Sequence, residues 1–119
     1  MASSLYGFNR LEAHDPVAPP LLWSEANSVL HETVWRGAIS LALAEATRDR
    51  LLAAAINQMA PKELHLEAWS VAEALGWAKT YDAEYVALAR LLDCRLLTVD
   101  RRLHRGVRWL VAIIGPTEL

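Results

Sequence analysis

The segment from Thr80 to Arg105, around which the rest of the chain is organised, reads TYDAEYVALARLLDCRLLTVDRRLHR. Its first half predicts a helix, because apolar side chains recur with helical spacing at Tyr85, Leu88, Ala89 and Leu92. Asp93 ends that helix, and the apolar run from Arg95 to Val99 has the size of a buried strand. The stretch therefore predicts a helix and then a strand, with a basic turn or short helix after Asp100.

Two carboxylates mark the ends of this unit. Asp82 stands at the predicted start of the helix, where unpaired N–H groups and the helix macrodipole favour a negative charge. Asp100 follows the predicted strand, and in open parallel sheets ligands bind at the edge formed by the carboxyl ends of the strands. Spacing alone leaves two interpretations open: a ligand site at that edge, or an N-cap and a turn residue with no further role.

A third acid, Glu25, follows an apolar run that contains proline. Because proline cannot donate to a sheet ladder, we expect a short strand from Pro20 to Trp23 with its proline at the start. Ser24 then has the character of an N-cap, for a helix that begins with Glu25 and ends near Arg36, before Gly37. The sequence leaves open whether Glu25 belongs to a site or only stabilises a first helical turn.

The remaining elements alternate between helices and strands. Ser40 is expected to cap a helix that runs to about Met59. The alternating segment Glu63–Leu66 predicts an edge strand, and Glu67–Leu75 predicts a third helix. A β-prone run follows at Val107–Ile114. Strands interleaved with helices predict an α/β domain with a mainly parallel sheet.

Length and composition predict one soluble domain. The chain has 119 residues, 54% of them hydrophobic, which suffices for a single domain over residues 1–119, with residues 1–16 irregular. The net charge of −2 creates no overall basic field, so nucleic-acid binding would need a local patch. The single Cys94 excludes an internal disulfide and fits a structural thiol in a reducing compartment. No apolar run is long enough for a membrane span and no signal pattern is visible, so we expect a cytoplasmic protein.

The three acids stand at junctions between predicted elements, and their chemistry suits a hard cation. Carboxylates that crowd together repel one another and are normally kept for a cation such as Mg²⁺ or Mn²⁺, or for a shared proton. Basic side chains next to one of the acids are placed to hold a phosphate backbone: Arg101, Arg102 and Arg105. The four histidines are scattered, and no phosphate-binding loop or serine-nucleophile motif is present. The combination predicts metal-dependent hydrolysis of phosphodiesters.

Three segments together resemble a known family. They are PPLLWSEANSVLH at Pro19–His31, TYDAEYVALA at Thr80–Ala89 and LLTVDRRL at Leu96–Leu103. In order and spacing they are similar to the PIN domain, most closely to the VapC-type toxin ribonucleases of bacterial toxin–antitoxin pairs. The resemblance covers most of the chain, about residues 16–116.

The resemblance implies a three-layer α/β/α fold with parallel strands, and a ribonuclease that depends on Mg²⁺ or Mn²⁺. Glu25, Asp82 and Asp100 match the acids of the family's site, and Thr98 matches its supporting hydroxyl residue. The implied substrate is RNA, and the implied partners are a small antitoxin protein and a second copy of the chain.

The resemblance also has a departure. Family members open with an apolar strand that ends in D-A-S or D-T-S, whereas here Met1 stands at the place of that Asp. Asp15 is a poor substitute, because it precedes the Pro20 strand and would lie at the opposite edge of the sheet. The missing strand is central in the family's sheet, so we expect residues 5–8 or a second chain to replace it, or the sheet to split. The function is then an active ribonuclease, a catalytically impaired remnant that acts only through protein contacts, or an α/β domain without a nucleic-acid role.

Overall fold

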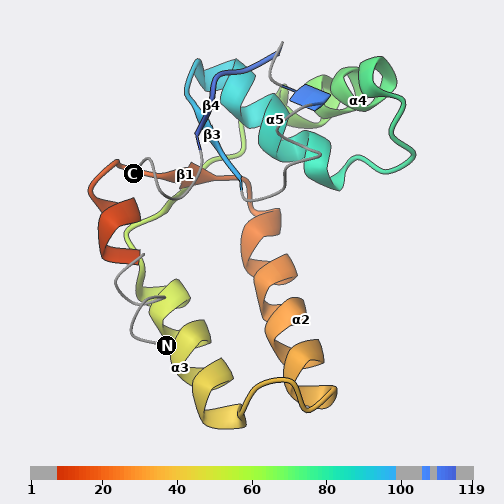
Figure 1. The fold of residues 1–119 in the computed structure, drawn as a ribbon. Helices are drawn as coiled ribbons and strands as arrows, with labels where there is room; N and C mark the ends of the chain where they lie inside the picture. Colours follow the sequence, from red (N-terminus) through yellow and green to blue (C-terminus); the bar gives the residue numbers. More distant parts are fainter. Residues whose placement is uncertain (1–7, 99–105, 108–109, 115–119) are drawn as a thin grey trace. The chain divides into compact units, whose positions relative to one another are not determined.

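The computed structural model describes residues 8–98, 106–107 and 110–114 (Figure 1). These residues fall into two compact units, Met1–Gln58 and Met59–Leu119, which are described in turn. Each unit contains helices and one pair of parallel strands, so the fold class is α/β, as predicted. That the whole chain acts as one domain stays a prediction. In the part of the chain described, no helix combines the length and the apolar character that a membrane span requires.

The first unit begins with a short helix, residues 8–12, and then strand β1, Val17–Ala18. β1 pairs in parallel with β2, Asn57–Gln58, with Val17 opposite Asn57. The predicted strand at Pro20–Trp23 is wrong. Pro20 already has helical torsion angles and is the N-cap, because proline's fixed φ suits the start of a helix, where its missing N–H costs nothing.

Helix α2, Leu21–Trp35, therefore starts earlier than predicted, and Ser24 lies inside it rather than at its N-cap. Its end agrees with the prediction. Arg36 is the C-cap and Gly37 adopts φ +75°, a left-handed conformation that glycine takes at little cost. This turn satisfies late carbonyl groups of the helix, since the Gly37 N–H donates to the Val34 carbonyl at 2.8 Å.

Helix α3, Leu41–Ala53, runs antiparallel to α2 and completes a helical hairpin (Figure 1). The predicted cap is confirmed, because the Ser40 hydroxyl accepts a hydrogen bond from the Leu43 N–H at 3.1 Å. The predicted end near Met59 is wrong. The chain turns to extended backbone at Ala54, and the Asn57 N–H donates to the Pro16 carbonyl at 2.9 Å, so pairing with the β1 segment overrides the helical pattern.

One carboxylate joins the start of this unit to the end of α3. Glu12 accepts hydrogen bonds from the Arg50 guanidinium and, at 2.6 Å, from the Ala55 N–H. The same guanidinium donates to the Asn9 side-chain oxygen at 3.1 Å and lies 5.1 Å from the centroid of the Phe8 ring. These five residues, the Glu12–Arg50 clasp, fasten residues 8–12 beside the strand pair.

The second unit begins with helix α4, Leu64–Leu75, so the predicted edge strand at Glu63–Leu66 is wrong. In a strand, Leu64 and Leu66 would point to the same face, but Leu64 is 0% exposed and Leu66 is 74% exposed. A helix separates these two positions by more than half a turn, which accounts for the difference. Gly76, at φ +70°, ends the helix as predicted.

Helix α5, Tyr81–Leu92, packs against α4 and forms the core of this unit (Figure 1). Small and branched side chains let the two helices approach closely, and those buried on α5 are Ala83, Val86, Ala87, Leu88 and Ala89. Asp93 ends α5 in a left-handed conformation, φ 51°, as predicted. An ion pair joins the two helices at their surface, between Arg90 and Glu67 at 3.4 Å.

Strand β3, Leu96–Leu97, confirms the predicted strand but is shorter. It pairs in parallel with β4, Ile113–Ile114. Of the β-prone run Val107–Ile114, only the end is a strand. Residues 106–107 are helical instead, and Val107 is fully buried. Of residues 5–8, which were expected to replace the missing strand, residues 5–7 lie outside the described residues, and Phe8 begins the short helix of residues 8–12.

Candidate functional site

Asp82 lies where the sequence predicted an acid, in the first turn of α5. Thr80 is the N-cap, so Asp82 is the second helical residue rather than the cap itself. Its side chain is exposed, and the start of a helix is a favourable place for a carboxylate. Asp82 is therefore a carboxylate side chain that a helix holds in place and that is open to a ligand.

Glu25 has a different position from the one predicted. It is half-buried in the second turn of α2, and the first turn of that helix holds no acid. The interpretation of Glu25 as a first-turn residue that stabilises the helix dipole is thus wrong, because α2 starts at Leu21. Glu25 belongs to the first unit and Asp82 to the second.

The other predicted site residues come after β3. Thr98 directly follows that strand and is half-buried. The third acid, Asp100, and the arginines expected to hold phosphate, Arg101, Arg102 and Arg105, lie outside the described residues. Among the residues that the structure does describe, no three His, Cys, Asp or Glu side chains gather closely enough to hold a metal ion. The described part of the chain therefore does not by itself form the predicted metal site.

A buried acid that the sequence reasoning missed is Glu84. It is the one buried charged residue of the described chain, on the helix that carries Asp82. Two residues along a helix correspond to a rotation of about 200°, so the two acids leave α5 on opposite sides. The apolar pattern of α5 did not reveal that Glu84 is buried, because a charged residue between core positions is expected to face solvent.

Cys94 lies between α5 and β3, at the strand entrance as predicted, but it is exposed rather than buried. Partial burial of the sulfur, and then the neighbouring Asp93 carboxylate, raise the pKa of the Cys94 thiol above its ordinary value. A raised pKa keeps the thiol protonated at neutral pH and makes it a poor nucleophile or metal ligand. Cys94 is thus no part of the candidate site.

The family assignment rests on most of the chain. The PIN domain family model matches residues 8–108, a range that includes Glu25, Asp82 and Asp100. The chain belongs to the PIN domain family. No curated protein matches it.

Membership explains the alternation of helices and parallel strands, because PIN domains are α/β proteins. PIN domains generally are nucleases that use divalent metal ions, so this PIN domain is of the nuclease kind. The exposed Asp82 carboxylate on α5 has the chemistry that such an ion requires, a hard oxygen ligand.

Proposed function

We propose that this PIN domain is a metal-dependent ribonuclease of the VapC toxin type. The observation that carries the proposal is the exposed Asp82 in the first turn of α5, within a chain that matches the family over residues 8–108. This is the position at which the resemblance expects a metal-binding acid. An acid that lay on the surface for an unrelated reason would have no cause to occupy the position of the family's metal-binding acid.

In this proposal Glu25, Asp82 and Asp100 hold Mg²⁺ or Mn²⁺, and Thr98 supports them. The bound ion supplies an activated water and neutralises charge on the scissile phosphate. Arg101, Arg102 and Arg105 hold the RNA backbone through charge-assisted hydrogen bonds to phosphate oxygens.

The proposed partners are RNA, a small antitoxin protein and a second copy of the chain, in the cytoplasm. A protein partner is supported by large apolar side chains that stand exposed on the α2–α3 hairpin, namely Val29, Leu41 and Leu52. Exposed apolar surface of this kind is typical of interaction sites.

A second candidate function rests on the same hairpin. α2 has 15 residues and buries none of them, although half of it is apolar. Two of its large apolar side chains, Val29 and Trp35, stand exposed, which favours a protein whose role is to bind another protein. The second proposal is therefore a catalytically impaired PIN remnant that acts only through contact with an antitoxin or with itself.

Manganese titration followed by an RNA-cleavage assay distinguishes the ribonuclease from the catalytically impaired remnant. The wild-type protein should bind Mn²⁺ in calorimetry and cleave RNA in a reaction that EDTA stops, and Asp82→Asn and Asp100→Asn should lose both properties. Glu73→Gln is the matched control, because Glu73 is an exposed acid on α4 of the same unit. Cleavage that persists in Asp82→Asn would contradict the proposed site. No binding at millimolar Mn²⁺ would favour the second function.

A further inference from the structure

Three aromatic side chains stand exposed in the described part of the chain: Trp35 on α2, Trp69 on α4 and Tyr81 at the start of α5. Of the three, Tyr81 is the one that lies beside an acid of the proposed metal site, because Asp82 is the next residue. A ring next to a site for RNA cleavage is suited to contact RNA, since every nucleobase has a flat face on which an aromatic ring stacks.

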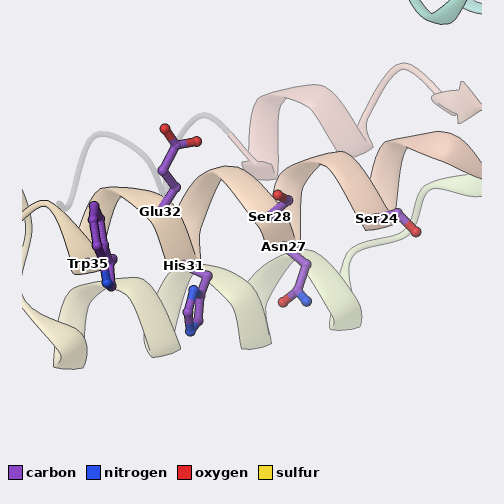
Figure 2. A pocket seen from close by; sticks show the side chains of 6 residues that line it. All are labelled: Ser24, Asn27, Ser28, His31, Glu32 and Trp35. Atoms are coloured by element: carbon purple, nitrogen blue, oxygen red, sulfur yellow. The ribbon is translucent and has the colours of Figure 1, made fainter.

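Trp35 serves as a contrast, because the surface around it does not suit RNA. It lies at one end of an open hollow along α2 (Figure 2). The other side chains of the hollow are Ser24, Asn27, Ser28, His31 and Glu32. Glu32 repels phosphate, and none of the six lining residues is a lysine or arginine that would attract it. Exposure of a ring thus does not by itself indicate RNA binding, and the neighbouring groups decide.

Burial decreases along one face of α5 toward Tyr81. Tyr81, Tyr85 and Leu88 follow one another at helical spacing, so they share a face of the helix. Leu88 is buried, Tyr85 is half-buried and Tyr81 is 54% exposed. This face therefore leaves the core of the second unit at the first turn of α5, the turn that carries Asp82.

Tyr81 and Asp82 are neighbours both along the chain and around the helix. Consecutive Cα atoms lie about 3.8 Å apart, and one residue of an α-helix corresponds to a rotation of about 100°. The two exposed side chains thus leave α5 on adjacent sides. An RNA strand with a phosphate at Asp82 therefore passes close to the Tyr81 ring.

A basic side chain stands two residues before this ring. Lys79 is exposed and forms no ion pair with another described residue. Its ammonium group attracts phosphate whatever base the nucleotide carries. Tyr81 and Lys79 together therefore offer the two kinds of contact by which proteins hold single-stranded nucleic acid, a stacking surface and a positive charge.

We propose that Tyr81 stacks on a nucleobase of the RNA substrate while Lys79 holds an adjacent phosphate. The inference rests on the proposed ribonuclease function and adds the contact that fixes the strand beside Asp82. Because stacking does not distinguish strongly among bases, Tyr81 requires that a base be present but selects no particular sequence.

Binding of two strands in EDTA tests the stacking contact without cleavage. One strand is a short oligouridine, the other has the same length but carries no bases, and fluorescence anisotropy gives the Kd of each. The wild-type protein should prefer the oligouridine. Tyr81→Ala should reduce this preference about tenfold, as expected for the loss of one stacking ring, and Tyr81→Phe should retain it.

Trp69→Ala is the matched control for Tyr81→Ala, because it removes an exposed ring on α4 of the same unit, and it should keep the preference. Three results would overturn the proposal: no binding of either strand by the wild type, equal binding of both, or an unchanged preference in Tyr81→Ala.

Lys79→Ala separates the phosphate contact from stacking. It should weaken binding of both strands by the same factor and reduce the slope of log Kd against log salt concentration by about 0.7, the contribution of one phosphate contact on a single strand. Lys62→Ala is the control, since Lys62 is an exposed lysine shortly before α4. An unchanged salt dependence in Lys79→Ala would exclude its contact with phosphate.

Cleavage kinetics distinguish a failure of this inference from a failure of the proposed ribonuclease. Stacking that is equal in the bound substrate and in the transition state affects affinity alone, so Tyr81→Ala should raise KM about tenfold and leave kcat unchanged. If EDTA stops cleavage but Tyr81→Ala has wild-type kinetics, the stacking contact is wrong and the ribonuclease stands. If Tyr81→Ala loses the preference for bases but the wild type cleaves no RNA, the contact stands and the ribonuclease is wrong.

Discussion

Glu12 and Arg50 lie 38 residues apart in sequence and form an ion pair that connects the N-terminal helix with the last turn of α3. The pair is half-buried, and the Ala55 N–H donates a further hydrogen bond to the same carboxylate at 2.6 Å. Because Ala55 lies just before β2, this contact holds the base of the α2–α3 hairpin beside the β1–β2 pair.

The clasp should make stability depend on pH in the acid range. The hydrogen bonds from Arg50 and then from Ala55 lower the pKa of Glu12 below its ordinary value of 4.5. A lowered folded-state pKa stabilises the fold above the unfolded-state value, and this stabilisation is lost as the pH falls through the folded-state pKa. The stabilities of the wild type and Glu12→Gln in urea denaturation should therefore differ most at neutral pH, and the difference should shrink below pH 4.5 and vanish below the folded-state pKa. Glu45→Gln, which replaces an exposed acid on α3, is the matched control.

Ser40→Ala should destabilise the protein by about 1 kcal/mol, because the N–H of Leu43 loses its capping acceptor. Ser70→Ala is the control. The Ser70 hydroxyl bonds to the Leu66 carbonyl within α4, where a helical backbone bond already exists, so its removal should cost about 0.5 kcal/mol or less. Equal losses in both variants, measured by urea denaturation, would contradict the capping role.

Gly76→Ala should cost about 1 kcal/mol, because Gly76 ends α4 at φ +70°, where a side chain strains the backbone. The space around Gly76 is open, so the cost is conformational and not a steric clash. Gly76→Asn should cost less, since asparagine tolerates this conformation. Thermal unfolding of the two variants should rank them in that order, and the reverse order would argue against a left-handed cap.

The start of α4 can be tested with two leucines. Leu64→Ala removes a fully buried side chain and should cost about 2–5 kcal/mol, whereas Leu66→Ala changes an exposed one and should cost about 0.5 kcal/mol or less. An edge strand would place both leucines on one face and make the two losses similar. Chemical denaturation of both variants therefore decides whether this segment is a helix or an edge strand.

Asp82→Ala should reduce stability by less than about 1 kcal/mol, the usual contribution of an exposed acid to the dipole of a helix start. Glu73→Ala should not destabilise the protein, because Glu73 lies near the C-terminus of α4, where a negative charge is unfavourable. A large loss of stability in Asp82→Ala would mean that any loss of nuclease activity reflects unfolding and not a missing ligand.

The sequence predicted correctly those helix boundaries that depend on a capping residue. Gly37, Gly76 and Asp93 end their helices as expected, and Ser40 begins α3. Each of these signals acts on the backbone of its own turn, so neighbouring residues contain all that decides it. The position of Asp82 in the first turn of α5 was predictable for the same reason.

One error, the end of α3, arose where distant segments meet. α3 ends at Ala53, although its apolar spacing continues, because Asn57 pairs with the chain at Pro16. Local periodicity cannot show such pairing, nor the ion pair that joins Glu12 to Arg50. A second error has a local cause. The apolar run with proline was interpreted as a strand, so α2 was predicted to start at Glu25, whereas it starts at Leu21 and Glu25 lies in its second turn.

The helix–strand unit from Tyr81 to Leu97, the ends of α2, α4 and α5, and the family all follow from local spacing and motif order in the sequence. Only the tertiary structure decided that Val17–Ala18 and Asn57–Gln58 are strands. It also decided that Glu84 is buried and that Trp35 is exposed. The reason is physical: a two-residue strand is too short to have a pattern of its own and exists only through its partner. Likewise, the burial of a side chain depends on what packs over it.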